Sequence, residues 1–403
     1  MMEMDKKALP EGWQVENLGD VCEFLDSRRV PLNETERNKR IIGKQQSELY
    51  PYYGANGQVG WIDDYLFDEP LILLAEDGGF FGSHSRSIAY AINGKSWVNN
   101  HAHVLRPKNN VDFNFLAYAL SIRPDVSKLV TGNTRPKLNQ QIASEIPVYL
   151  PSLPEQKRIA AILTERLAAV ERARKASEAR LEAARALPAA YLREVFESAA
   201  ARGWCKIRLG ELVISPLRTG VSKPEKPDSG KKCLTLSAVR NGSLLLDKVK
   251  SVDVTDAEAK RNEIRAGVFY VVRGNGNRSL VGRGGIAPNQ CSGVIFPDLL
   301  FEVNPNPNIL SIDFLRWAWD SQSVRSQIEE KAKTAAGIYK INQQNLASIE
   351  LSIPPLFIQK HVAEILSNKI SKITGIQGMI FDELAAIGTM PASYLCQAFS
   401  GAL

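Results

Sequence analysis

Leu138-Asn139-Gln140-Gln141 recurs further along the chain as Ile341-Asn342-Gln343-Gln344, an offset of 203 residues (138 to 341). The same offset relates Gln156-Lys157 to Gln359-Lys360, and no gap is needed between the two matches. Self-similarity at a fixed spacing is the mark of a duplicated structural unit. The sequence therefore predicts one unit written twice, in which a globular domain is followed by a long helix.

The starts of the two predicted domains match at a different offset. Gly12-Trp13 corresponds to Gly203-Trp204, 191 residues later. The second globular domain is therefore about a dozen residues longer than the first. We expect domains at 1–150 and 199–353, with helical segments at 151–198 and 354–403.

Composition sets the broad class of the protein. The 403 residues are 44% hydrophobic and 23% charged, which is ordinary for a globular chain and argues against bulk disorder. No apolar run reaches the roughly 20 residues needed to cross a bilayer, and the start lacks the apolar segment of a signal peptide. The five cysteines are scattered without a Cys-x-x-Cys pair, so we expect reduced thiols and a cytoplasmic location. A net charge of +6 permits nucleic-acid binding without demonstrating it.

Both long segments follow a proline-rich entry, which a first helical turn tolerates and a helix interior does not. Apolar residues recur along each segment at spacings that keep them on one helical face. We expect these two stripes to pack together as a coiled-coil pair; the alternative is that each helix packs only on its own domain. The residues predicted at this helix-pair interface are Ile159, Leu163, Val170, Leu181, Val362, Leu366, Ile373, Ile376, Leu384 and Ile387.

The globular halves are rich in predicted strands and belong to the α+β class. Short apolar runs at 71–75 and 268–272, each bounded by glycine or charge, are typical of buried strands. Segments 113–121 and 312–319 have the period of short helices, and the aromatic residues of the second are expected in the core.

Catalytic signatures are weak. There is no phosphate-binding Gly-x-x-x-x-Gly-Lys-Ser/Thr motif, and the glycine-rich run 274–279 lacks the third glycine of a dinucleotide-binding loop. Two Glu-x-Lys triplets, ending at Lys260 and Lys331, resemble those of nucleases but lack an acidic partner on a preceding strand. His101 and His103 could share a metal, although no third ligand is evident and a structural role is favoured. We predict no catalytic residues and no metal site.

Loops rich in glycine, amides and basic residues occur in both halves. Arginine can pair with the acceptor edge of guanine, asparagine with adenine, and lysine with phosphate. Any single residue of this kind is more often part of a solvated turn, but the set on two domains favours a DNA reader. The candidates are Tyr52, Tyr53, Asn56, Asn99, Asn100, Thr134, Arg135, Lys137, Arg240, Asn241, Arg273, Asn275, Asn277, Arg278, Arg283, Tyr339 and Lys340.

These features resemble the specificity (S) subunits of type I restriction–modification systems over essentially the whole chain. The resemblance rests on the opening Leu9-Pro10-Glu11-Gly12-Trp13 and on the phrase 134–139 that leads to a helix entry at 153–159. It also rests on the second copy of that phrase at 339–342 and on Tyr52-Tyr53-Gly54-Ala55-Asn56-Gly57. The second helix entry departs from the first, because Phe357-Ile358 stands where the first has Pro154-Glu155.

The resemblance implies two target-recognition domains, each reading one half of a bipartite, asymmetric site in double-stranded DNA. It implies antiparallel pairing of the two helices as a spacer, a pseudo-twofold repeat, and docking of methyltransferase (M) subunits, two in number. A motor and nuclease (R) subunit would join for cleavage, and S-adenosylmethionine and ATP with Mg²⁺ would bind those partners, with no cofactor in this chain. Two alternatives stay open: an enzyme using the run 274–279 or a Glu-x-Lys triplet, and an assembly scaffold with inert loops.

Overall fold

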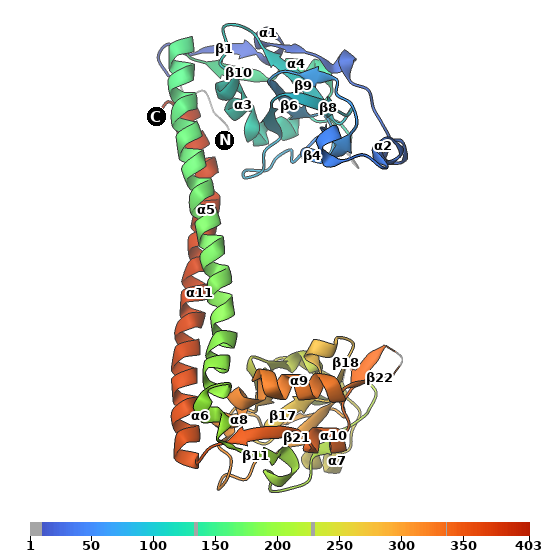
Figure 1. The fold of residues 1–403 in the computed structure, drawn as a ribbon. Helices are drawn as coiled ribbons and strands as arrows, with labels where there is room; N and C mark the ends of the chain where they lie inside the picture. Colours follow the sequence, from blue (N-terminus) through green and yellow to red (C-terminus); the bar gives the residue numbers. More distant parts are fainter. Residues whose placement is uncertain (1–9, 133–135, 227–229, 336) are drawn as a thin grey trace. The chain divides into compact units, whose positions relative to one another are not determined.

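The computed structural model describes residues 10–132, 136–226, 230–335 and 337–403. The chain divides into two compact units (Figure 1). Unit 1 comprises residues 1–179 and 380–403, and unit 2 comprises residues 180–379. Each unit therefore holds one globular domain together with part of each long helix, and the two units are described separately below.

Unit 1 is built around two four-stranded sheets. The first has the order β2-β9-β6-β7, with β2 at Cys22–Phe24, β9 at Ala102–Pro107, β6 at Leu71–Ala75 and β7 at Ala89–Ile92. The second has the order β4-β3-β8-β5, with β4 at Gly57–Ile62, β3 at Tyr50–Gly54, β8 at Lys95–Val98 and β5 at Phe67–Asp68. Strand β6 lies between β9 and β7, and every one of its residues is buried. Its two faces contribute to two different cores, Ile72 and Leu74 to one and Leu71 and Leu73 to the other, which explains the continuous apolar run. The strand predicted at 71–75 is confirmed.

Short elements close the first domain. Strand β1 (Gln14–Asn17) pairs antiparallel with β10 (Pro147–Leu150), and α1 (Leu18–Val21) follows β1 directly. Helix α2 spans Glu34–Ile41, α3 spans Phe113–Ser121 and α4 spans Gln140–Ser144. The α3 residues Phe115, Leu116 and Leu120 are buried in the main core of the unit. The predicted helix 113–121 is confirmed.

Unit 2 has a six-stranded sheet of order β12-β21-β17-β19-β15-β14. Its strands are β12 (Arg218–Thr219), β21 (Leu300–Val303), β17 (Phe269–Val272), β19 (Gly284–Ile286), β15 (Gly242–Leu244) and β14 (Val239–Arg240). A smaller sheet orders β16 (Val249–Val252), β13 (Lys231–Leu234) and β20 (Val294–Ile295), and another orders β18 (Gly274–Asn275), β23 (Ile338–Lys340) and β22 (Lys333–Ala335). Helix α7 spans Asp256–Arg261, α8 spans Ile312–Trp319, α9 spans Gln322–Lys331 and α10 spans Gln343–Ala347. The α8 aromatics Phe314, Trp317 and Trp319 are buried, so their predicted place in the core is confirmed.

The repeated sequence corresponds to repeated local structure. Strand β11 (Cys205–Arg208) pairs antiparallel with β24 (Glu350–Ile353), as β1 pairs with β10 in the other unit. Asn139 and Asn342 are the N-cap residues of α4 and α10, and their side-chain oxygens accept hydrogen bonds from the N–H groups of Ile142 and Asn345 at 2.9 and 2.7 Å. The recurring Leu/Ile-Asn-Gln-Gln sequence is thus a capped helix start that precedes the strand leading to each long helix.

The long helices are α5 (Leu153–Phe196) and α11 (Leu356–Phe399), each 44 residues. They run antiparallel to each other within both units. In unit 1, the Ser177 hydroxyl donates to Glu383 Oε1 at 3.1 Å and the Arg166 guanidinium lies over the Tyr394 ring. In unit 2, Gln377 donates to the Ala184 carbonyl at 3.1 Å and Lys369 pairs with Glu194 at 3.4 Å. No helix of the described chain is long and apolar enough to span a membrane.

Burial along the helices follows a seven-residue repeat. On α11, successive buried residues are seven positions apart: Leu366, Ile373, Ile380 and Ile387. On α5, the buried residues Leu163, Ser177 and Ala184 are separated by multiples of seven. Of the other residues predicted at the helix-pair interface, Ile159 and Leu181 are buried. Val170, Val362 and Leu384 are only half-buried. A repeat of seven corresponds to 3.5 residues per turn, the spacing of a coiled-coil seam.

One predicted interface residue is corrected. Ile376 is 41% exposed, while Ile380, which was not predicted, is only 2% exposed. The seam advances from Ile373 to Gln377 and then to Ile380, alternating steps of four and three. A step of three from Ile373 leads instead to a residue at the edge of the seam, where solvent reaches it.

Candidate nucleic-acid interface

Several of the loops singled out in the first domain lie together. The Asn56 amide donates to the Gly78 carbonyl at 2.9 Å, and a β-bridge joins Asp77 to Lys137. His101 Nδ1 lies 2.8 Å from Asp77 Oδ1. The loops that follow β3 and β6 and the loops that precede β9 and α4 therefore meet in unit 1.

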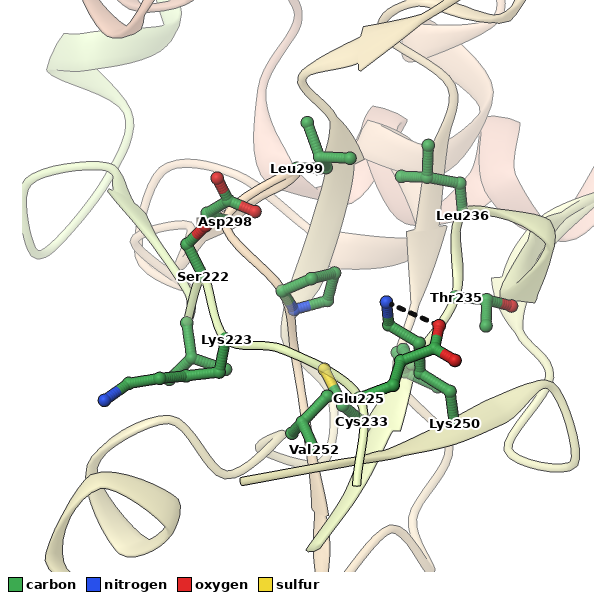
Figure 2. Close-up of a pocket in the computed structure, with 13 residues that line it drawn as sticks. Ser222, Lys223, Glu225, Cys233, Thr235, Leu236, Lys250, Val252, Asp298 and Leu299 are labelled. Carbon is green, nitrogen blue, oxygen red and sulfur yellow. Dashed lines mark hydrogen bonds and ion pairs between the residues drawn. The ribbon is translucent and has the colours of Figure 1, made fainter. Parts of the chain in front are cut away.

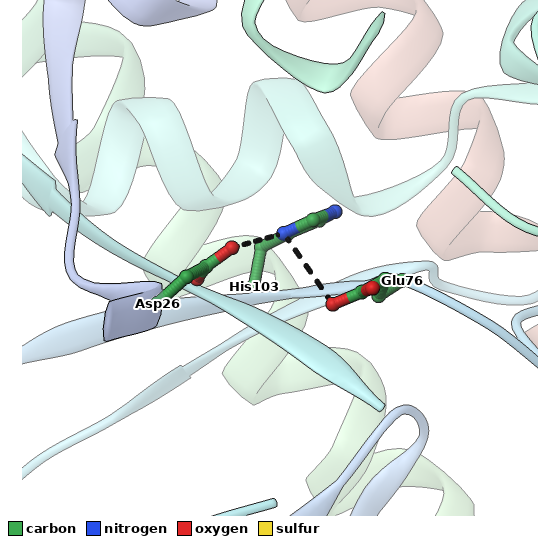
Figure 3. Close-up of side chains that lie close together, drawn as sticks. All are labelled: Asp26, Glu76 and His103. Carbon is green, nitrogen blue, oxygen red and sulfur yellow. Dashed lines mark hydrogen bonds and ion pairs between the residues drawn. The ribbon is translucent and has the colours of Figure 1, made fainter. Parts of the chain in front are cut away.

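A buried ionic cluster lies beneath these loops (Figure 3). His103 Nδ1 is 2.5 Å from Asp26 Oδ2, and Glu76 Oε2 lies 3.8 Å from the same nitrogen. His103 Nε2 is 2.7 Å from the Leu138 carbonyl, which can only accept, so this nitrogen donates. Arg29 pairs with Glu76 at 2.7 Å.

The cluster ties the outer loop to the sheet. Lys137 Nζ lies 3.0 Å from Glu76 Oε1, and the Leu138 N–H donates to the Glu76 carbonyl at 2.7 Å. Although burial works in the opposite direction, the hydrogen bonds from Arg29 and Lys137 hold the pKa of the Glu76 carboxyl below its usual value. Lys137 and Leu138 are therefore held to Glu76 by an ion pair and a backbone hydrogen bond.

The same cluster has the donor types of a metal site. One ligand atom each from Asp26, Glu76 and His103 lies within 4.8 Å of the others. Their charges, however, are opposed by two cations, Arg29 and Lys137, and one ring nitrogen is taken by a backbone carbonyl. This arrangement fits an internal ion-pair network that positions a loop. The sequence pointed to His101 and His103 as a pair, but they have different partners, Asp77 and Asp26.

The tyrosine and amide candidates of unit 1 have unequal access to a ligand. Tyr52 is 1% exposed and its hydroxyl donates to the Leu32 carbonyl, so the prediction that it contacts DNA is wrong. Tyr53 is half-buried, and Asn99 is buried with its side-chain oxygen accepting from the His101 N–H. Asn56 and Asn100 are exposed. The predicted Thr134 and Arg135 lie outside the described residues.

In unit 2, the candidates around 273–278 meet those around 339–340. Strand β18 pairs with β23 so that Asn275 lies opposite Tyr339 and Gly274 opposite Lys340. A Cβ at Gly274 would lie 2.9 Å from Lys340 Cγ, so a larger residue at this position would have to displace the Lys340 side chain. The exposed Lys340 side chain forms no ion pair with a described residue.

Other basic and amide residues of this segment have structural partners. Asn277 accepts hydrogen bonds from the backbone and hydroxyl of Ser279 and begins a short 3-10 turn. Arg278 donates to the Glu329 carbonyl, and Arg273 lies over the Phe301 ring and donates to the Asp298 carbonyl at 3.4 Å. These residues shape the loop, which leaves Lys340 freer to contact a ligand.

The remaining candidates line a separate polar pocket of ≈ 410 Å³. Arg240, Asn241 and Arg283 contribute to it, together with Asp320, which the sequence did not single out. Asp320 is the C-cap residue of α8 and comes next to β19 only through the fold, so no local pattern indicated it.

In a second pocket of unit 2, the lysine side chains are paired with glutamates (Figure 2). It has a volume of ≈ 380 Å³ and is lined by Lys223, Glu225, Cys233, Lys250 and Asp298, among others. Lys250 pairs with Glu225 at 3.1 Å, and Lys223 pairs with a glutamate outside the pocket at 2.9 Å. Burial raises the pKa of the Cys233 thiol to about 11, so the thiol is held in its neutral form. Both lysines of this pocket are therefore paired with glutamates of the protein.

The Glu-x-Lys triplets lie on helices. Glu258 and Lys260 belong to α7, where Glu258 forms a capping box with Thr255 and pairs with Lys223. Glu329 and Lys331 belong to α9. Neither triplet lies on a strand beside converging acids, the context that metal-dependent cleavage would need.

Comparisons with known proteins agree with this architecture. A family model described as type I restriction modification DNA specificity domain matches residues 10–179 and 300–384. The EcoKI type I restriction enzyme specificity subunit of Escherichia coli K12 is 23% identical over 99% of this chain and 91% of its own length. A putative type I specificity subunit of Haemophilus influenzae is 32% identical over 38% of each chain.

Solved structures show the same fold. The HsdS subunit of Thermoanaerobacter tengcongensis superposes with a TM-score of 0.61 at 16% identity, covering 99% of both chains. A chain from a structure of a type I restriction–modification complex gives a TM-score of 0.70 at 16% identity, covering 98% of this chain and all of the other.

The duplicated α+β domains, the paired long helices and the family match define a DNA-recognition protein of a restriction–modification system. The chain belongs to the type I restriction–modification specificity subunits.

Proposed function

We propose that each unit reads one half of a bipartite site in double-stranded DNA, and that the chain supplies recognition without catalysis. The observation that carries this proposal is that exposed amide and basic side chains gather on loops of each globular domain: on the loops joined around Asp77 and Lys137 in unit 1, and at the β18–β23 pair and the polar pocket of Arg240 and Arg283 in unit 2. Such side chains offer the donors that base edges and phosphates accept. Because the two loop sets differ in sequence, the two half-sites should differ as well.

The long helices are proposed to serve as spacer and docking surface for two methyltransferase subunits, with a motor and nuclease subunit joining for cleavage. The duplicated entries to α5 and α11 support two equivalent docking regions, because the same local structure occurs twice. S-adenosylmethionine, ATP and Mg²⁺ would then act on those partner subunits. A protein of twofold character meets DNA half-sites about one helical turn, roughly 34 Å, apart.

A DNA-binding assay tests the reading role. The full chain, purified with its co-expressed methyltransferase subunits, is titrated onto a random-sequence 40-base-pair duplex at several salt concentrations. Replacing Lys340 by Gln should weaken binding and lower the salt slope by about one, because one phosphate contact is lost. The control is Lys206→Gln, which removes an exposed lysine from β11, away from the loops.

The outcomes separate the competing functions. Equal affinity of the Lys340 variant and the control would contradict a DNA contact at the β18–β23 loops. Unchanged affinity after further removal of Arg240 and Arg283 would favour an assembly scaffold. Cleavage or methylation of DNA by the purified chain alone would contradict the non-catalytic role.

A further inference from the structure

A tight turn in unit 2 presents two of the candidate DNA-contacting residues. Arg240 ends β14 and lies opposite Ser243 of β15, with Asn241 and Gly242 between them. Asn241 has φ 52° and is the only non-glycine residue of the described chain with positive φ, and Gly242 has φ 73°. Two successive positive φ values are characteristic of the two-residue turn that Asn-Gly favours. The turn therefore fixes the direction in which the Arg240 and Asn241 side chains leave the backbone.

Arg316 of α8 holds this turn from behind. Its Nη2 donates to the Asn241 carbonyl at 2.8 Å, and its guanidinium lies 4.0 Å from the Trp317 ring centre. A Cβ on Gly242 would lie 2.2 Å from Arg316 Nε, so only glycine leaves room for the arginine. The turn cannot change its position without displacing Arg316.

The pocket in front of the turn contains charges of both signs that are not paired with each other. Its wall includes the exposed side chains of Arg240, Arg283 and Asp320. None of the three forms a side-chain hydrogen bond or an ion pair with any residue in the described part of the chain. If these charges only stabilised the fold, we would expect them to form ion pairs with each other, as Lys250 and Glu225 do in the pocket of Figure 2.

Two further guanidinium groups make the surroundings of the pocket positive. Arg283, Arg316 and Arg325 are all within electrostatic range of Asp320. Arg316 Nε and Arg325 Nη1 are buried without a hydrogen-bond partner in the described structure. Burial lowers the pKa of both guanidinium groups, although Arg325 Nη2 also lies 3.8 Å from Glu329 Oε1. Burial raises the pKa of the Asp320 carboxyl, and the charges of Arg325, Arg316 and Arg283 act against that shift. An electron-rich ligand group would be attracted to this position.

The Asp320 carboxylate indicates whether the pocket fits a DNA phosphate or the edge of a base pair. A phosphate would be attracted by the arginines and repelled by Asp320, because two negative charges in contact repel even in water. A base-pair edge offers donors and acceptors side by side. Guanine presents O6 and N7, which accept from arginine, and cytosine presents the N4 amino group, which donates to a carboxylate. A G·C pair therefore matches both signs of charge in the pocket.

We propose that Arg283 and Asp320 read one G·C base pair in the half-site of unit 2, with Arg283 bound to guanine and Asp320 to cytosine. This inference rests on the proposed function, because it requires that unit 2 reads DNA. The Arg240–Asn241 turn, held by Arg316, forms the opposite wall and is a positioning element for the same contact.

Selection from a random-sequence duplex library tests the assignment. The full chain with its co-expressed methyltransferase subunits should select a bipartite site whose unit 2 half contains an invariant G·C pair. Asp320→Asn and Arg283→Gln should each reduce discrimination at that one position by about 10-fold to 100-fold, because a good base contact contributes a factor of this order. Other positions should keep their preferences. Glu350→Gln, which alters an exposed carboxylate on β24 outside the pocket, is the control.

Three results would overturn the inference. If Arg283→Gln lowers affinity for all sequences equally and leaves the selected site unchanged, the pocket contacts a phosphate. If both variants behave like the control, the pocket does not touch DNA, although reading by other loops would stand. If the wild-type protein selects no sequence at all, the proposed function fails together with this inference. Circular dichroism of each variant separates loss of folding from loss of recognition.

Discussion

The buried side chain of Gln156 in α5 accepts a hydrogen bond from the backbone N–H of Asp112, at 2.9 Å, where Asp112 is the N-cap of α3. Its amide donates to the Pro151 carbonyl at 2.9 Å. Gln359 in α11 makes the corresponding bonds in unit 2, accepting from the N–H of Ser311, the N-cap of α8, at 2.8 Å and donating to the Pro354 carbonyl at 2.8 Å. One glutamine thus anchors each long helix to the short helix of its own globular domain.

Replacing Gln359 by Ala should destabilise unit 2 by more than a surface change would. The Ser311 N–H and the Pro354 carbonyl would lose their buried partner, and an unsatisfied buried polar group costs about 1–3 kcal/mol. We expect the free energy of unfolding in urea to fall by at least about 2 kcal/mol. Gln344→Ala, at an exposed position of α10, should change it by less than about 0.5 kcal/mol. Equal effects of the two substitutions would contradict the anchoring role.

The repeat predicted this anchoring only in part. The Gln-Lys pairs at 156 and 359 were visible as a repeated motif, but the sequence could not show that the glutamine is buried while the lysine is exposed. The contact it makes lies 44 residues earlier in the chain, at Asp112, and such a non-local pairing leaves no local pattern. Local signals did identify the strand at 71–75 and the two short helices, because burial on one face repeats within a few residues.

Asn139 and Asn342 allow a second test, because both act as helix N-caps in the repeated motif. Asn→Ala at either position should lower the stability of its unit by about 1 kcal/mol, because an N–H of the first helical turn loses its acceptor. Asn→Asp should retain most of the stability, since a carboxylate caps equally well. Thermal unfolding of the two variants at each position measures the difference. Equal losses for Ala and Asp would show that the side-chain oxygen is not what stabilises the start of α4 or α10.

The candidate DNA contacts were harder to foresee than the fold. Tyr52 adjoins Gly54 and Asn56, a composition typical of an exposed loop, yet it lies on β3, where strand alternation directs its side chain into the core. No local sequence pattern indicates Asp320, because only the tertiary structure brings it close to Arg283. The residue types in a loop can indicate a nucleic-acid surface, but which side chains are free depends on the backbone hydrogen bonds around them.

The corrected register of the helix pair gives a third prediction. Ile380 is 2% exposed and Ile376 is 41% exposed, although both are isoleucines on α11. Ile380→Ala should lower the free energy of unfolding by about 2–5 kcal/mol, because a buried side chain is removed and a cavity remains. Ile376→Ala should cost far less, since its side chain is largely in water. If Ile376→Ala proved the more damaging change, the seam would follow the stripe first expected from the sequence.

The ionic cluster of unit 1 should make its stability depend on pH. The pKa of Glu76 is below its ordinary value of 4.5, so its ionised form stabilises the folded state at neutral pH. For a carboxyl with a lowered folded pKa, this contribution is complete above the unfolded pKa and is lost as the pH falls through the folded pKa. We expect the thermal midpoint of unit 1 to fall as the pH is lowered from about 5 to about 3. Glu76→Gln should unfold at a lower temperature at pH 7, because Arg29 and Lys137 lose their charged partner, and its midpoint should fall less over this acid range. The exposed Glu145→Gln should instead follow the wild-type curve. A Glu76→Gln variant with the full acid sensitivity of the wild type would show that another carboxyl is responsible.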